Sequence, residues 1–188
     1  MKILSINRTL DQSVNEAINH LAIIPDSAII REGKPFFIPG FSQHWEYQAT
    51  IAFRVTRLGK NIAAKFAHRY IDALALAVRT IPRELEASAT PSAITTAFDG
   101  AFIIGEWLNL DQFESNKTIS IEIENQTCSI DISQLAIEDT IALLSKYLTL
   151  KIGDIIAPAT LPINGNISIN TIIEGRLNNN PNIRLKFK

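Results

Sequence analysis

The sequence contains little cysteine and no excess charge of either sign. Cys128 is the only cysteine among the 188 residues, so no internal disulfide supports the fold, and a reducing compartment is expected. The formal net charge is −1, which gives no global field to recruit nucleic acid or an anionic membrane. No stretch approaches the ~20 apolar residues of a membrane helix, and Met1–Leu10 lacks the apolar run of a secretory signal. We therefore expect a cytoplasmic protein with neither a nucleic-acid nor a membrane partner.

The composition is that of an ordinary globular domain. Apolar residues make up 46% of the chain and charged residues 20%, and this length can bury a full core without a metal or disulfide. No internal repeat and no low-complexity linker divides the chain. We therefore predict a single domain spanning residues 1–188.

The clearest periodicity is the two-residue repeat of a β-strand over residues 46–55. One face would carry Tyr47, Ala49, Ile51, Phe53 and Val55, and the other Glu46, Gln48, Thr50, Ala52 and Arg54. The segment Ile71–Val78 is almost entirely apolar, as expected of a strand buried on both faces. Two long strands therefore precede the middle of the chain.

Shorter patterns predict the remaining elements. The other expected strands are Ile3–Ile6, Ala101–Ile104, a hairpin of Ile119–Ile123 with Cys128–Ile132, and then Ile155–Ala157, Ile167–Ile173 and Ile183–Phe187. The expected helices are Asp11–Leu21, Ala63–Arg69 (with Asn61 as its cap) and Leu135–Tyr147. The sum is an α+β, β-rich protein with two or three short helices.

Several phrases, in a fixed order, resemble a known family. They are KPFFIP at 34–39, EYQATIAFRVTRLGKNI at 46–62, AHRYIDALA at 67–75, FDGAFIIGEWL at 98–108 and LTLKIGDII at 148–156. In this order they resemble the fumarylacetoacetate hydrolase family, especially its small single-domain bacterial branch. The resemblance is best over residues 25–154 and poor over residues 1–24.

The resemblance implies a fold and a chemistry. The fold would be a mixed β-sandwich or β-roll, and the protein would commonly be a homodimer. The chemistry would be the hydrolysis or decarboxylation of a β-keto acid with bound Mg²⁺ or Mn²⁺. These are expectations carried over from the family.

The family's metal ligands are replaced here. Counted without gaps from Arg57-Leu-Gly-Lys60, the positions of its two glutamates fall on Gln48 and Thr50, and that of its aspartate falls on Arg79. A histidine that often precedes the first glutamate corresponds to Glu46. The lysine expected two residues before Phe98-Asp-Gly corresponds to Thr96.

Two neighbouring segments also depart from the family pattern. The Thr-Gly-Thr-Pro turn expected after Gly153-Asp154 reads Pro-Ala-Thr-Leu at 158–161. The long lid segment that precedes the lysine position is reduced to Glu86–Thr95. The resemblance therefore implies a degenerate active site.

Charge gives these replacements a physical meaning. Gln48 and Thr50 offer neutral oxygens, whereas a hard dication normally takes one or two carboxylates. Arg79 is permanently protonated, and at ~4 Å with an effective dielectric of ~20 it would repel a dication by roughly 8 kcal/mol. We therefore expect neither a metal nor another cofactor. The Arg79 guanidinium could instead occupy the metal position and pair with Glu46, or it could lie on the surface at a strand end.

A shifted alignment gives a different site. His44, Glu46 and Gln48 read H-x-E-x-Q and would share one side of a strand, where His44 and Glu46 could bind a softer metal such as Zn²⁺. This alignment needs an insertion that the first does not. Separately, Arg54, Arg57, Lys60, Lys65, His68 and Arg69 form a basic cluster that could meet a carboxylate or phosphate, or be a solvated face.

Two functions follow. The first is a catalytically degenerate member of the family that binds a small carboxylate in a pocket of Glu46, Gln48, Thr50 and Arg79, or that acts as a homodimer or as the partner of an active relative. The second is an active hydrolase or decarboxylase of a β-keto or acylpyruvate acid, using Mg²⁺ or Mn²⁺ in a rearranged site. Whether the chain is an enzyme is left open by its sequence.

Overall fold

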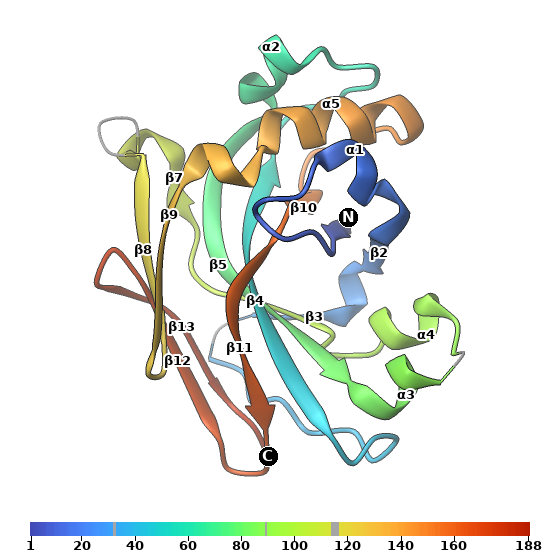
Figure 1. Ribbon diagram of the computed structural model, residues 1–188, viewed down its shortest axis with the longest axis vertical. Helices are drawn as coiled ribbons and strands as arrows, with labels where there is room; N and C mark the ends of the chain where they lie inside the picture. Colours follow the sequence, from blue (N-terminus) through green and yellow to red (C-terminus); the bar gives the residue numbers. More distant parts are fainter. Residues whose placement is uncertain (32, 89, 114–116) are drawn as a thin grey trace.

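The computed structural model describes residues 1–31, 33–88, 90–113 and 117–188 (Figure 1). The strands are β1 Lys2–Ile6, β2 Leu21–Pro25, β3 Ile29–Arg31, β4 Trp45–Val55, β5 Ile71–Pro82, β6 Phe102–Ile104, β7 Leu108–Asn109, β8 Thr118–Ile123, β9 Gln126–Asp131, β10 Ile155–Ala157, β11 Thr160–Ile167, β12 Ile172–Leu177 and β13 Asn180–Lys186. The α-helices are α1 Val14–Ala17, α2 Ala64–Ala67, α3 Arg83–Ala87, α4 Ser92–Thr96 and α5 Ile137–Tyr147. The 3-10 helices are η1 Ile18–His20, η2 Asp26–Ala28, η3 His68–Tyr70, η4 Leu110–Phe113 and η5 Ile132–Leu135.

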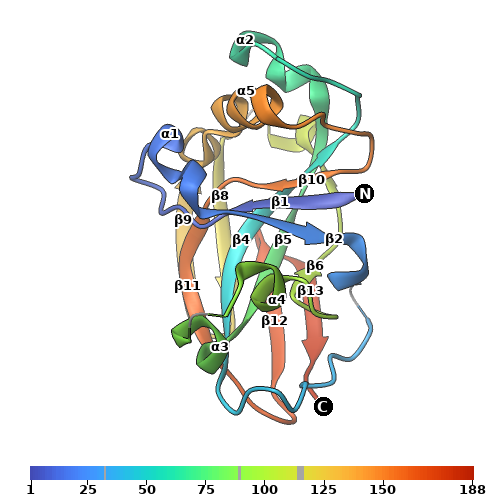
Figure 2. The same cartoon turned by 90° about the vertical axis from the view of Figure 1, so that its right-hand side faces the viewer.

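The larger sheet curls into a roll. Its strand order in the described residues is β2-β1-β10-β4-β5-β6-β3, with β11 beside β4 and β7 beside β5. The two strands at the ends of this order, β2 and β3, are joined directly through η2, so the sheet must bend to bring its ends together. Figure 2 shows the result, with β1 and β2 crossing β4 and β5.

Alanine is the commonest residue inside this roll. The roll interior consists of Ile3, Ile24, Ala28, Ala52, Ala75, Ala77, Ala101, Phe102, Ile104, Ile155 and Ala157. Ala52 and Ala75 are cross-strand partners on β4 and β5, and their short side chains let β1 and β2 approach closely. Larger side chains there would overpack the interior, typically at a cost of about 1–3 kcal/mol.

The opposite face of β4 and β5 carries the main core. Tyr47, Ile51 and Val55 are fully buried there with their neighbours on β5. The smaller sheet, of order β13-β12-β8-β9, and α5 contribute to the same core. The two-residue alternation predicted over 46–55 is therefore confirmed, because its two faces meet two different sets of apolar side chains.

The α+β, β-rich fold class is confirmed. Four of the α-helices in the described residues have four or five residues, and α5 has 11. Within these residues no helix is both long and apolar enough to span a membrane.

Three local predictions were wrong. The helix expected over Asp11–Leu21 is only the single turns α1 and η1, because Leu21 already pairs with β1. The strand expected over Ile167–Ile173 is a turn between β11 and β12, with Asn170 at φ 68°. Asn61 does not cap α2, whose N-cap residue is Ala63 with no side-chain cap.

Candidate functional site

The pairing of β4 with β5 brings the former metal positions together. Gln48 lies directly opposite Arg79, and Thr50 lies opposite Ala77. Directly opposed residues of an antiparallel pair place their side chains on the same face. This face is the inner face of the roll, since Ala77 belongs to the roll interior. The structure therefore places Gln48, Thr50 and Arg79, the three positions selected by the ungapped alignment, side by side on this face.

The Gln48 and Thr50 side chains donate hydrogen bonds to backbone carbonyls of a neighbouring segment. Gln48 Nε2 donates to Leu161 O at 2.5 Å and to Ile163 O at 3.1 Å, and Thr50 Oγ1 donates to Ala159 O at 2.6 Å. The β4–β11 ladder is irregular between Thr160 and Asn164, so these carbonyls need another donor. Both side chains thus stabilise the irregular part of β11.

The Arg79 side chain is buried, but its guanidinium makes no hydrogen bond within the described residues. Its side chain is 8% exposed. In the described residues every fully buried side-chain nitrogen or oxygen has a hydrogen-bond partner, so the guanidinium nitrogens must keep a narrow contact with solvent. Burial lowers the pKa of Arg79, and the charge of Glu86 opposes this shift. The surface position that was one prediction for Arg79 is therefore wrong.

Glu46 has a different partner from the one expected. Its Oε2 accepts a hydrogen bond from Arg83 Nη2 at 2.5 Å, and Arg83 Nη1 also contacts Glu86 at 3.2 Å. The bond from Arg83 lowers the pKa of Glu46. The predicted pairing of Arg79 with Glu46 is therefore corrected. Glu46 lies at the N-terminal end of β4, where Arg83, at the start of α3, forms the ion pair with it.

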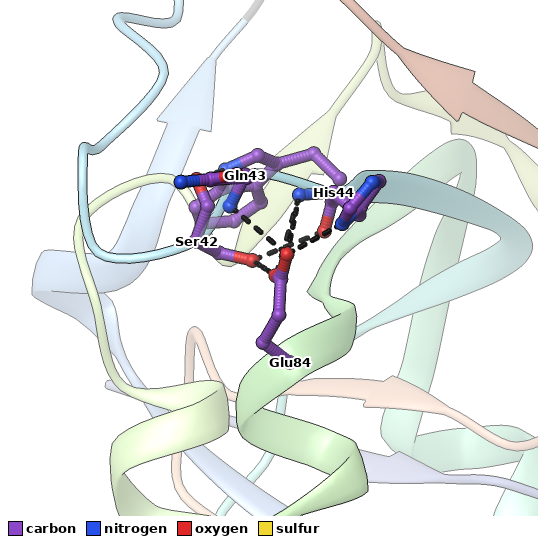
Figure 3. Close-up of polar contacts among 5 residues, drawn as sticks. Ser42, Gln43, His44 and Glu84 are labelled. Atoms are coloured by element: carbon purple, nitrogen blue, oxygen red, sulfur yellow. Dashed lines mark hydrogen bonds and ion pairs between the residues drawn. The ribbon is translucent and has the colours of Figure 1, made fainter.

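His44 is also bound by α3. Its Nδ1 lies 2.5 Å from Glu84 Oε1, and the same carboxylate accepts bonds from Ser42 Oγ and from the backbone N–H groups of Gln43 and His44 (Figure 3). These bonds, that from Ser42 first, lower the pKa of Glu84 to about 2. His44 is directed to Glu84 and Glu46 to Arg83, so the two are not joined as the Zn²⁺ alternative required.

The shortened lid segment covers the inner face of the roll. It contains the last two residues of α3 and most of α4, and α4 packs against β2 and β5. Thr96, at the lysine position, is buried at the end of α4. Residue 89 of this segment lies outside the described residues.

The side chains present do not fit the family's metal. The former ligand positions supply an amide and a hydroxyl that already donate to carbonyls, and a buried guanidinium. Hard divalent cations require oxygen ligands, normally including carboxylates. Over the described ranges no group of three or more His, Cys, Asp or Glu side chains is placed to hold a metal ion.

Two cavities lie near the two ends of β4. One, of about 410 Å³, is lined by Gln48 together with Asp11, Thr160 and Asn164, but not by Arg79. The other, of about 500 Å³, is lined by Arg31, Arg54, Ile104, Glu106 and Trp107 among others. Neither unites Glu46, Gln48, Thr50 and Arg79 in the single pocket that the sequence predicted.

The curled sheet, with polar side chains on its inner face, defines a protein of the β-roll fold. Residues 7–179 match the family described as "Fumarylacetoacetate (FAA) hydrolase C-terminal". The chain therefore belongs to the fumarylacetoacetate hydrolase family.

Similar proteins have several activities. The oxaloacetate tautomerase fahd-1 of Caenorhabditis elegans is 22% identical over 143 residues, covering 71% of this chain and 67% of that protein. The fumarylpyruvate hydrolase of Pseudomonas aeruginosa, solved with Mn²⁺ and pyruvate, has a TM-score of 0.81 at 16% identity, covering 100% of this chain and 89% of the other. The maleylpyruvate hydrolase of Sphingobium sp. SYK-6 has a TM-score of 0.78 at 16% identity, covering 99% and 69%. At these identities the structural likeness shows the fold alone.

Sequence reasoning missed the role of α3. Glu84 binds the loop before β4, and Arg83, which also contacts Glu86, holds Glu46. The dense charge of residues 83–86 was visible, but its partners lie about 40 residues earlier and depend on the β4–β5 register. Glu46 is paired with Arg83, so in the described residues the Arg79 guanidinium on the inner face has no hydrogen-bonded carboxylate.

Proposed function

We propose that this member of the family does not carry out the metal-dependent reaction and instead binds a small carboxylate at Arg79. The observation that carries the proposal is the buried Arg79 guanidinium, which makes no hydrogen bond in the described residues and lies opposite Gln48. A buried cation without a partner costs several kcal/mol. A bound carboxylate would offset that cost.

Arg79 is suited to such a ligand. A guanidinium can donate two parallel hydrogen bonds to one carboxylate, and these charge-assisted bonds are stronger than neutral ones. Glu86 lies near enough to affect the pKa of Arg79 but forms its ion pair with Arg83. No carboxylate of the described residues accepts a hydrogen bond from Arg79, so its donors could bind an incoming anion.

The relatives suggest the chemical class of the ligand. One was solved with pyruvate, and the name of another contains oxaloacetate. Both molecules are small 2-oxo acids, so pyruvate is the natural first probe. In this chain Arg79 would supply the positive charge.

Calorimetric titration with pyruvate in the presence of a chelator tests the proposal. Wild-type protein should bind pyruvate saturably, and Arg79→Met should weaken binding about tenfold or more, as loss of charge-assisted hydrogen bonds requires. Arg83→Met is the matched control, since Arg83 is also a cation of this region but is partly exposed and already paired with Glu46. Equal binding by wild type and Arg79→Met would refute the proposal.

The active-enzyme alternative gives a different result. Turnover of oxaloacetate or an acylpyruvate, dependent on Mn²⁺ and faster than Mn²⁺ alone, would replace the binding function with catalysis. A homodimer, or a partnership with an active relative, stays a prediction that sedimentation analysis can test.

A further inference from the structure

One end of the molecule, here called the basic cap, is built from two stretches, 56–70 and 143–153. The first contains α2 and η3, and the second contains the end of α5 and the turn that follows it. Backbone hydrogen bonds join them, from Gly59 N to Leu150 O at 3.0 Å and from Asn61 N to Ser145 O at 2.9 Å. In both views α2 and α5 lie together at the end of the molecule opposite to the C-terminus (Figures 1 and 2).

Large apolar side chains of the basic cap are exposed. The exposed fractions are 66% for Leu58, 42% for Phe66, 64% for Tyr147 and 71% for Ile152. Single exposed apolar residues are common, but four of them in two joined stretches at one end of the molecule favour a binding site. The neighbouring cavity of about 550 Å³ is lined by Lys146 but by none of these four side chains. They therefore do not line a groove there.

The exposed charged residues of the two stretches are all basic. They are Arg57, Lys60, Lys65, Arg69, Lys146 and Lys151, six of the 18 Lys and Arg residues of the chain. Neither stretch contains Asp or Glu. In the part of the chain that the structure describes, none of the six forms an ion pair, and the cationic groups of Lys65 and Arg69 lie 4.9 Å and 5.1 Å from the Phe66 ring centre.

We propose that the basic cap binds peripherally to the surface of an anionic lipid bilayer. Lys and Arg side chains would meet the charged headgroups, and Phe66 and Tyr147 would lie at the interface, where aromatic rings are favoured. A fluid headgroup layer can bury exposed apolar side chains without a matching groove, whereas a helical peptide partner would need one.

The overall charge of −1 does not oppose this interaction. Electrostatic attraction to a surface is screened within about 8–10 Å at physiological salt, so the charge facing the bilayer decides. The two stretches of the basic cap carry six Lys and Arg residues and no Asp or Glu, a local excess that the net charge of the whole chain does not show. The proposal is independent of Arg79 and of carboxylate binding.

Co-sedimentation with vesicles tests the proposal. Wild-type protein should bind vesicles of phosphatidylcholine with phosphatidylserine, bind phosphatidylcholine alone much less, and dissociate as salt rises. Lys65→Gln should lower the partition coefficient about fivefold, as expected for one cation near an anionic surface. Leu58→Ser with Ile152→Ser should also lower it.

The opposite end of the molecule provides a control. Ile169 is 69% exposed and Lys186 is exposed, and both lie outside the basic cap. Ile169→Ser with Lys186→Gln should leave vesicle binding unchanged. The proposal is overturned by absence of wild-type binding to the anionic vesicles, by equal binding of the cap variants, or by binding to RNA or an acidic protein without vesicle binding.

Discussion

Two buried arginines are expected to respond in opposite ways to the same substitution. Arg79 and Arg8 are 8% and 2% exposed. Arg8 donates to six backbone carbonyls, including Pro158 O, Gln12 O and Leu135 O, over 2.7–3.5 Å. The Arg79 guanidinium makes no hydrogen bond in the described residues. Methionine removes the charge of either side chain and keeps much of its volume.

The magnitudes follow from these partners. Arg8→Met leaves buried carbonyls without donors and should lower the free energy of unfolding by about 3–5 kcal/mol. Arg79→Met removes a desolvated cation, so without ligand it should raise the free energy of unfolding by about 1–3 kcal/mol. The gain is limited because the guanidinium nitrogens keep some contact with solvent. For a chain of this length, 1 kcal/mol corresponds to a shift in Tm of about 2–4 °C.

Urea unfolding, followed by circular dichroism and by tryptophan fluorescence, measures both variants. Coincident transitions by the two probes establish the two-state behaviour that the comparison needs. A loss of stability in Arg79→Met as large as that in Arg8→Met would show that Arg79 has a structural partner. The carboxylate proposal would then lose its physical basis.

Three further predictions concern other residues. Hydrogen bonds, that from Ser42 first, lower the pKa of Glu84 from 4.5 to about 2, so the ionised carboxylate stabilises the fold above pH 4.5 and this contribution is lost as the pH falls toward 2. Glu84→Gln should therefore make the free energy of unfolding fall less steeply between pH 4.5 and pH 2, and an unchanged pH dependence would contradict this. Gly100 has φ 91°, and an added Cβ would lie 2.1 Å from the Phe36 ring, so Gly100→Ala should destabilise the fold by more than about 1 kcal/mol in urea. Burial raises the pKa of Cys128, so at neutral pH its thiol should react more slowly with a disulfide reagent than that of a short peptide, and an equal rate would refute this.

The fold was predictable where a pattern was long. The alternation over 46–55 placed Gln48 and Thr50 on one face, and the β4–β5 register then brought Arg79 opposite Gln48. The pattern over Ile167–Ile173 misled because isoleucines continue through a turn. There Asn170 adopts the left-handed conformation that asparagine tolerates.

The partners of the site residues were less predictable. Glu46 and Arg79 carry opposite charges on neighbouring strands, so a pair between them was the simplest expectation. The structure joins Glu46 to Arg83 instead, because α3 begins immediately after β5 and places Arg83 beside the N-terminal end of β4. Such tertiary geometry cannot be derived from strand periodicity.

Metal binding by the wild-type protein tests the central claim most directly. A millimolar ion that binds the native state at micromolar Kd would raise the free energy of unfolding by about 4 kcal/mol. We predict that millimolar Mg²⁺ or Mn²⁺ leaves the urea transition of the wild-type protein unchanged. A stabilisation near 4 kcal/mol that Thr50→Val abolishes would contradict the account, because it would place the family's metal at positions where we infer that none can be held.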